Sequence, residues 1–413
     1  MILFNSHRLS NGLRLLHHYD GVTKMVAVNL LYDVGSRDES MGRTGLAHLM
    51  EHLMFTGTAS APNFDTCLQV AGGESNAWTG VDVTNYYETL PAHNLETAFW
   101  LEAGRLQELN LHDSSIATQK SVVIEEFRQR CLNMPYGDVV HLINGLAYRE
   151  HPYRWPTIGE RVDDIEQASH DEIRAFFKTH YAVNNLILCV SGNVQFCEVV
   201  KLAEKWFGDI APQPLLARSL PVEPAQQEAR FLTAHRNNVP QDLLYMTYHM
   251  CARGDADYQA TDLLSDVLAN GTSSRFYQNL LLKTSLFTEL DASIMGTRDP
   301  GLFLVRGKLG HGVKFDEAKK AIEAELNRLV QDGVTAYELE KCCNKFESSA
   351  LFESIAYADK AEKLCRYELE GEAGDINTEI ERYRAVTPNH IARVANSVFA
   401  PCNCSTLYYG PNA

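Results

Sequence analysis

The sequence predicts an α+β fold built from two structurally repeated domains, each a mostly antiparallel sheet with helices packed mainly on one face. The chain has 413 residues, which is too long for one ordinary hydrophobic core. Strand-like and helix-like segments follow one another in the same order in the two halves. A proline-rich stretch without periodicity, residues 211–227, separates the halves and is expected to be a linker. We therefore expect an N-terminal domain at 1–210 and a C-terminal domain at 228–413.

The composition is that of a folded, acidic protein. Apolar residues make up 45% and charged residues 22% of the chain, and the net charge is −16. Such a charge disfavours binding to nucleic acid or to an anionic membrane surface. No signal peptide and no apolar run of membrane-spanning length are visible. The ten scattered cysteines are then expected to be reduced thiols, which predicts a cytoplasmic protein.

In the first half, residues 46–55 are predicted to form one amphipathic helix, with Thr44 as N-cap and Gly57 as the stop. His48 and His52 are four residues apart on its polar side, so their rings point the same way and could hold one zinc ion. Glu51 lies beside them and could accept a proton from water. An ordinary solvated face is the alternative. The apolar stripe opposite is expected to contain Leu46, Leu49, Met50, Leu53 and Met54.

Strand-like segments flank this helix. Residues 26–34 read as a central strand, and residues 74–90 as two strands around a turn near 80–82, after a helix at 63–71. The first strand of this hairpin follows Gly72 and Gly73 and could form a sheet edge that accepts an extended peptide. An ordinary hairpin is the reading that the pattern alone favours.

Two helices are expected at 95–109 and 114–130. On the second of these helices, Glu126 falls at the edge of the apolar face, whereas Glu125 falls far outside it. A carboxylate turned toward a core usually has a partner or a metal, so Glu126 is expected to form either a salt bridge or a metal contact. Gln119 lies on the same side two turns earlier.

The second half repeats this order, with a strand at 243–249, a helix at 258–268, a hairpin region at 290–309, helices at 315–331 and 336–351, and a last strand before Pro411. When the helix of the second half is laid on that of the first, Asp262 replaces His48, Ser265 replaces Glu51 and Asp266 replaces His52. The second domain is therefore predicted to be an inactive repeat without a zinc site.

With these motifs in place, the chain resembles the pitrilysin, insulinase and mitochondrial-processing-peptidase family of inverted-motif zinc peptidases. The half-size chain is similar to the branch in which two chains form a clamshell. The resemblance covers nearly the whole length, and the stretches that carry it are residues 45–58, 72–73, 75–77, 82–87, 122–126, 151–153 and 181–194.

The resemblance implies a role for each candidate residue. His48, His52 and Glu126 would bind one zinc ion per chain, and Glu51 would be the general base in the hydrolysis of peptide bonds of short or unfolded polypeptides. The edge strand would hold the substrate in extended form through Ser75, Asn76 and Ala77. Gln119 stands where the family often has a glutamate that supports the metal ligands.

The resemblance also shows a departure in the second half. Self-sufficient members carry an arginine and a tyrosine, seven positions apart, in the helix after the Ser-Ser-Arg stretch; those positions here hold Leu281 and Thr288. This implies a catalytic subunit that forms a homodimer or heterodimer with a chain of the same fold, which could supply the arginine and tyrosine. A non-catalytic scaffold subunit is the main alternative, and a small-molecule lyase of related fold is a more remote one.

Overall fold

The computed structural model describes residues 1–215 and 217–412, which form two compact units. Unit 1 contains Met1–Arg128, Trp155–Leu220 and Ala350–Thr378. Unit 2 contains Gln129–Arg154, Pro221–Ser349 and Glu379–Ala413. Each unit has its own sheet and its own hydrophobic core, so each is described by itself.

Unit 1 is built on a six-stranded sheet with the order β1-β2-β6-β3-β5-β4. Neighbouring strands are antiparallel except for the parallel pair of β2 and β6. Strand β4 pairs only with β5 and is therefore an edge of the sheet. The strands are β1 (Asn5–Arg8), β2 (Arg14–Tyr19), β3 (Met25–Tyr32), β4 (Glu74–Thr79), β5 (Thr84–Pro91) and β6 (Leu186–Gly192).

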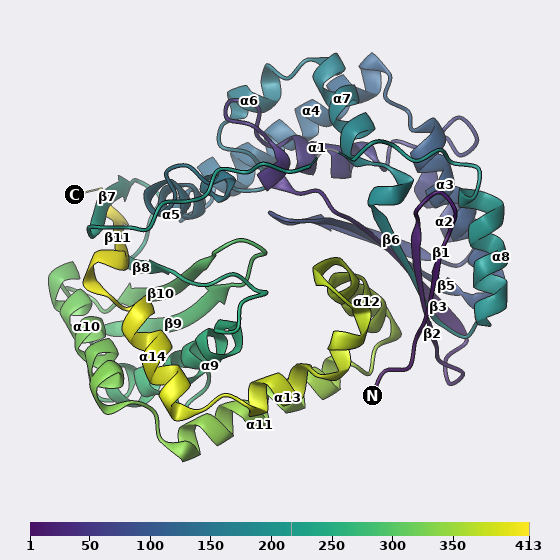
Figure 1. Ribbon diagram of the computed structural model, residues 1–413. Coiled ribbons are helices and arrows are strands. Elements are labelled where there is room, and N and C mark those ends of the chain that lie inside the picture. Colours follow the sequence, from purple (N-terminus) through teal and green to yellow (C-terminus); the bar gives the residue numbers. More distant parts are fainter. Residues whose placement is uncertain (216, 413) are drawn as a thin grey trace. The chain divides into compact units, whose positions relative to one another are not determined.

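Most helices of unit 1 cover one face of this sheet, where the larger core lies, and α12 lies against the opposite face (Figure 1). Apolar residues of α12, among them Leu364 and Cys365, pack against alternate residues of β3 and β6. The helices are α1 (Leu46–Leu53), α2 (Phe64–Val70), α3 (Leu95–Glu108), α4 (Asp113–Phe127), α6 (Val162–Glu166), α7 (His170–His180), α8 (Phe196–Phe207) and α12 (Tyr357–Glu370).

Unit 2 contains a five-stranded sheet with the order β7-β11-β8-β10-β9, in which only β7 and β11 are parallel. The strands are β7 (Arg230–Arg236), β8 (Leu243–His249), β9 (Phe287–Met295), β10 (Leu302–Leu309) and β11 (Cys404–Pro411). The helices are α5 (Val139–Ala147), α9 (Tyr258–Ala269), α10 (Phe315–Asp332), α11 (Ala336–Glu353, mainly in this unit), α13 (Glu379–Arg384) and α14 (Pro388–Val398).

The strand order confirms the predicted repeat. Without β1, the order β2-β6-β3-β5-β4 of unit 1 corresponds strand by strand to β7-β11-β8-β10-β9 of unit 2, and the parallel pair occupies the same place in both. In both units helical segments connect the central strand to the hairpin that forms the sheet edge: α1 and α2 lie between β3 and β4, and α9 lies between β8 and β9. The predicted α+β class with mostly antiparallel sheets is confirmed.

The units differ from the expected ranges 1–210 and 228–413 because two segments are exchanged between the halves of the sequence. Residues 129–154, which include α5, belong to unit 2, and residues 350–378, which include α12, belong to unit 1. Each sheet is apolar on both faces, and the helices from the same half of the sequence cover only one of them. The other face is covered by the exchanged helix, α12 in unit 1 and α5 in unit 2. On β11, for example, Tyr408 lies in the main core while its neighbour Tyr409 contacts Tyr136 beside α5.

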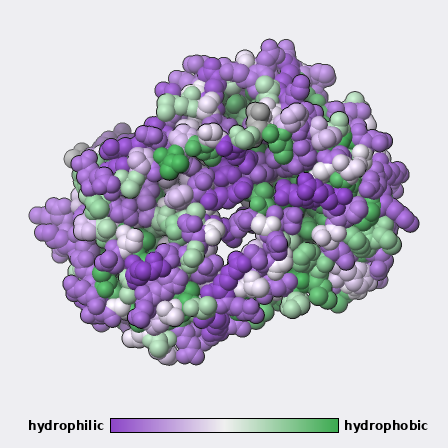
Figure 2. Space-filling model, in the orientation of Figure 1, coloured by the Kyte–Doolittle hydropathy of each residue, from purple (hydrophilic) through white to green (hydrophobic). Residues whose placement is uncertain are grey.

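The visible surface is predominantly hydrophilic, and the hydrophobic residues on it occur in small groups (Figure 2). In the part of the chain that the structure describes, no helix is both long enough and apolar enough to cross a membrane.

Candidate metal centre

The candidate site of unit 1 begins with α1. The stripe predicted from its sequence, Leu46, Leu49, Met50, Leu53 and Met54, is buried. On the other side of the helix the His48 and His52 rings lie one above the other, with centroids 4.8 Å apart and planes at 85°. Their side chains are 12% and 24% exposed, so both rings face a partly enclosed space.

Glu126 reaches this pair from α4. Its Oε2 atom lies 3.7 Å from Nε2 of His48 and 3.3 Å from Nε2 of His52. Ligand atoms about 2.1 Å from a tetrahedral zinc lie about 3.4 Å apart, so the observed spacing fits three ligands of one ion. Two imidazoles and a carboxylate are also a donor set that zinc accepts while keeping a fourth position open. The three side chains could therefore hold a metal ion.

The N-terminus of α1 differs from the prediction, because Thr44 is not its cap. The Thr44 hydroxyl donates to Asp164 at 2.7 Å, and Gly45, with φ of 85°, occupies the N-cap position. Two amides at the start of the helix donate instead to the carboxylate of Glu39, from Gly45 N at 2.9 Å and from Ala47 N at 2.8 Å. Burial raises the pKa of Glu39 to about 8. No sequence pattern indicates this role for Glu39, because a cap that comes from a preceding loop has no fixed spacing.

Glu51, the expected base, lies on α1 between the two histidines. Its Oε2 accepts a hydrogen bond from the hydroxyl of Thr79, the last residue of β4. Two buried tyrosines, Tyr86 and Tyr181, lie near it with their hydroxyls 3.4 Å apart. Burial, as the largest cause, and the Glu51 carboxylate both raise the pKa of each phenol, so both stay neutral. Three neutral hydroxyl groups, those of Thr79, Tyr86 and Tyr181, therefore lie near the base.

Ser75, Asn76 and Ala77 lie on β4, at the open edge of the sheet. The amide of Ala77 donates to the side-chain oxygen of Asn76 at 2.8 Å, and the amide of Gly80 donates back to Val83 at 2.8 Å. Backbone groups alternate in direction along a strand, so both contacts indicate that Ser75, Ala77 and Thr79 turn their backbone groups away from β5. An extended chain could pair with them there.

Three further predicted positions, one in unit 1 and two in unit 2, are not members of the three-ligand cluster found among the described residues. Gln119 is half-buried on α4, and among the described residues no hydrogen bond joins it to His48 or His52. Leu281 ends a short helical segment, Tyr277–Leu281, in unit 2. Thr288 lies on strand β9, not on a helix, and its hydroxyl accepts a hydrogen bond from Gln241 at 3.0 Å.

A buried charged cluster under the site was also missed. Arg105 and Glu102 of α3 form an ion pair at 2.8 Å with both side chains at most 1% exposed. The Arg105 guanidinium stacks on Phe64 at 3.6 Å and on Phe55, which follows α1, at 4.6 Å. Burial and the adjacent Glu102 raise the pKa of Glu88 far above its ordinary value. Positions 102 and 105 lie on the buried face of the predicted helix, which was the available signal.

The equivalent helix of the second unit, α9, carries no such centre. Asp262 accepts a hydrogen bond from the Tyr383 hydroxyl at 2.5 Å, and Asp266 accepts one from Asn270. Burial raises the pKa of both carboxyls. Among the described residues these two do not form part of a three-ligand cluster.

The chain is similar to known proteins both in sequence and in fold. The family profile described as "Insulinase (Peptidase family M16)" matches residues 14–160, and the one described as "Peptidase M16 inactive domain" matches residues 167–346. The chain is 30% identical to "Zinc protease PqqE" of Helicobacter pylori over 98% of this chain and 92% of the relative. It is 24% identical to "Probable mitochondrial-processing peptidase subunit beta, mitochondrial" of Arabidopsis thaliana over 98% of this chain and 77% of that protein.

Solved structures agree with these matches. A protease from Helicobacter pylori superposes with a TM-score of 0.93 at 29% identity, with both chains fully covered. The periplasmic protease PqqL from Escherichia coli shares the fold, with a TM-score of 0.80 at 18% identity; all of this chain matches 48% of that longer one. The site geometry, the repeated fold and the sequence relatives agree, and the chain belongs to the insulinase family, peptidase family M16.

Proposed function

We propose that this chain is a zinc-dependent endopeptidase or oligopeptidase that hydrolyses peptide bonds of short or unfolded polypeptides. The observation that carries the proposal is the convergence of His48, His52 and Glu126 from two helices, with Glu51 between the histidines on α1. A scaffold protein has no need of this donor set at ligand spacing. The relatives named zinc proteases support the same reading.

The residues divide the chemistry between them. When bound, zinc acts as a Lewis acid that polarises the substrate carbonyl and stabilises the negative charge that develops on its oxygen. The carboxylate of Glu51 accepts a proton from the attacking water and returns it to the leaving nitrogen. Strand β4 holds the peptide extended through the backbone of Ser75 and Ala77, with Asn76 between them, and thereby orients the scissile bond. Gln119 lies on the same helix as Glu126 but makes no hydrogen bond to His48 or His52 among the described residues, so no step is assigned to it.

The test is hydrolysis of a mixed library of quenched peptides by the zinc-loaded chain, with Glu51→Gln as the blank. The variant should keep one zinc per chain and lose turnover, because an amide cannot accept the proton. If wild type and variant cleave the library equally, with or without a partner chain, then the peptidase proposal fails.

We further propose that the active form pairs with a second chain of the same fold. Leu281 and Thr288 cannot supply the guanidinium and phenol that the family resemblance leads us to expect there, so a partner would provide them. The 48% coverage of PqqL supports this, since one molecule of that protease has room for two such chains. Co-purification and light scattering measure the pairing. A monomer as active as any reconstituted pair would contradict it.

A non-catalytic scaffold subunit is the second candidate function. Leu281 and Thr288 favour it, because they stand where an active member of the family would carry arginine and tyrosine. It predicts zinc binding without turnover in every pairing.

The cellular location is a separate proposal. All ten cysteines are free thiols, which favours a reducing compartment, and we propose the cytoplasm. Cell fractionation decides this, and recovery in the periplasm would overturn it.

A further inference from the structure

We propose that Thr79 is a positioning residue that holds the carboxylate of Glu51 and ties it to the edge strand. The inference rests on the proposed function and deepens it, because it concerns how the Glu51 carboxylate is held in a fixed position relative to the strand that binds the substrate. No role for Thr79 follows from the sequence motif, which ends many residues earlier.

The contact joins two elements that are far apart in the sequence. The hydroxyl of Thr79, at the end of β4, donates to Oε2 of Glu51 on α1. A glutamate has three rotatable side-chain bonds, so a fixed donor restricts its carboxylate to one position. Thr79 is also one of the residues whose backbone faces the open edge. A peptide paired with β4 and the carboxylate of Glu51 are therefore positioned by the same strand.

The turn that follows Thr79 is itself held in place. The amide of Gly80 closes the turn onto Val83 O at 2.8 Å. The neighbouring loop donates to the same turn, from Ser36 N to Gly80 O at 3.2 Å and from Arg37 N to Val81 O at 3.0 Å. A side chain at Gly35 would meet the Val81 backbone at 2.5 Å, so only glycine permits this close approach.

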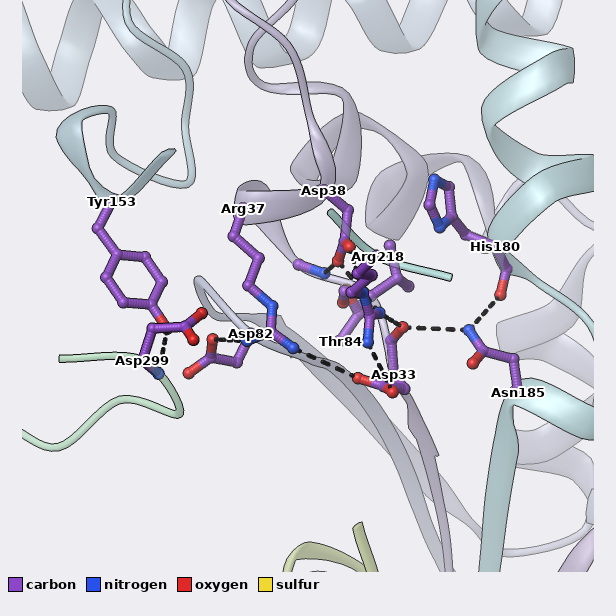
Figure 3. Close-up of polar contacts among 12 residues, drawn as sticks. Asp33, Arg37, Asp38, Asp82, Thr84, Tyr153, His180, Asn185, Arg218 and Asp299 are labelled. Carbon is purple, nitrogen blue, oxygen red and sulfur yellow. Dashed lines mark hydrogen bonds and ion pairs between the residues drawn. The ribbon is translucent and has the colours of Figure 1, made fainter. Parts of the chain in front are cut away.

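Ion pairs fix the loop and the turn further (Figure 3). The Arg37 side chain, 5% exposed, pairs with Asp82 of the turn at 3.0 Å and with Asp33 at 3.7 Å. Arg218 binds Asp33 at 2.7 Å and Asp38 at 2.6 Å. Buried charges that are paired on several sides move little, because separating them leaves a charge without compensation. The strand end that carries Thr79 is thus a rigid support for the base.

The experiment compares Thr79→Val, which keeps the shape and removes the donor, with Thr79→Ser, which keeps the donor. Thr79→Val should lower kcat about 10- to 100-fold, the usual cost of losing a supporting hydrogen bond at a metal site, with KM and zinc content near wild type. Thr79→Ser should recover most of kcat. Equal kcat in Thr79→Val and wild type, or no recovery in Thr79→Ser, would overturn the proposal.

The same hairpin provides a matched control. At its other end the Thr89 hydroxyl donates to Glu74 at 3.0 Å, so Thr89→Val removes the same kind of bond away from the base. Thr89→Val should leave kcat unchanged, and an equal loss in Thr89→Val and Thr79→Val would mean that any damage to the hairpin has this effect.

A second readout does not depend on turnover. Crystal structures of zinc-loaded wild type and Thr79→Val should show the Glu51 carboxylate in one position in the first and displaced or divided between positions in the second. An unmoved Glu51 in Thr79→Val would overturn the proposal. If no peptide is cleaved by any form, the proposed function fails, and these structures still decide whether Thr79 positions Glu51.

Discussion

At the scale of single residues, Glu126 is the ligand candidate that lies farthest from the helix motif in sequence. Replacement by glutamine removes the charge that faces both histidines, at 3.3 and 3.7 Å. We expect Glu126→Gln to weaken zinc binding at least about 10-fold, as measured by competition with a chelating dye. The adjacent Glu125→Gln is the control, because Glu125 is exposed and does not belong to the three-ligand cluster, and its 3.7 Å ion pair with the exposed Arg128 is weak. Equal zinc affinities in the two variants would show that Glu126 is not a zinc ligand.

Glu39 makes the stability of the chain depend on pH. Its folded pKa of about 8 lies above the ordinary value of 4.5, so the proton is bound more tightly in the folded state. Its stabilising contribution is complete below about pH 4.5 and is lost as the pH rises through about 8, by up to about 5 kcal/mol. The measurement is the free energy of unfolding in urea at several pH values. Glu39→Gln cannot titrate and should show a smaller decline, and parallel curves for the two proteins would contradict this.

The helix motif shows what could be predicted at this scale. The stripe of α1 and the place of its histidines on the opposite side follow from a period of 3.6 residues, and the structure confirms the stripe. The helical period alone placed Glu126 at the edge of a buried face and left a salt bridge or a metal contact open, and only the family resemblance implied that it is the third ligand. The cap at Glu39 and the contact from Thr79 depend on how separate segments meet, which no local period records.

At the scale of elements, α3 is attached to the site through buried charges. Three charged residues here are at most 1% exposed: Arg105, Glu102 and Glu88. One guanidinium and two carboxyls reach neutrality with a single shared proton, which agrees with the raised pKa of Glu88. Glu88→Gln should therefore cost little. Arg105→Met leaves the carboxylate of Glu102 buried without its cation and should cost about 3–5 kcal/mol of unfolding free energy in urea titrations. A larger cost for Glu88→Gln than for Arg105→Met would refute this assignment.

The order of helices and strands along the chain could largely be predicted from the sequence, but the pairing of the strands in the sheets could not. The expected hairpin at 74–90 is β4 and β5, and the expected strand at 243–249 is β8. The place of β4 at the sheet edge was one of two readings, because strand order is set by pairings across the chain. The helix expected to carry Leu281 and Thr288 is instead a short helical segment followed by strand β9.

At the scale of the whole molecule, the repeat was visible in the sequence and the exchanged helices were not. Both halves show the same order of helix-like and strand-like hydrophobic patterns. Helices α5 and α12 are amphipathic like the others, and their own sequences do not indicate which sheet they cover. The physical reason for the exchange is that each sheet has a second apolar face. In unit 1 this face includes Leu16, Leu31 and Ile187, each at most 1% exposed.

A fragment of residues 1–220 should therefore be unstable by itself. Without α12 the apolar face of its sheet is open to water, and about 25 cal/mol is lost for each Å² so uncovered. We expect such a fragment to bind a hydrophobic dye and to aggregate, and co-expression of residues 350–378 to reduce both effects. A soluble fragment 1–220 with cooperative thermal unfolding would contradict this prediction.

The late position of α12 also has a consequence for synthesis. The ribosome has made all of residues 1–220 when another 158 residues, up to Thr378, are still needed to complete unit 1. At about 5–20 residues per second this takes roughly 8–32 s, far longer than a helix or hairpin needs to form. During that time the nascent chain carries a finished sheet with one bare apolar face. We therefore expect chaperones to bind the nascent chain during this interval.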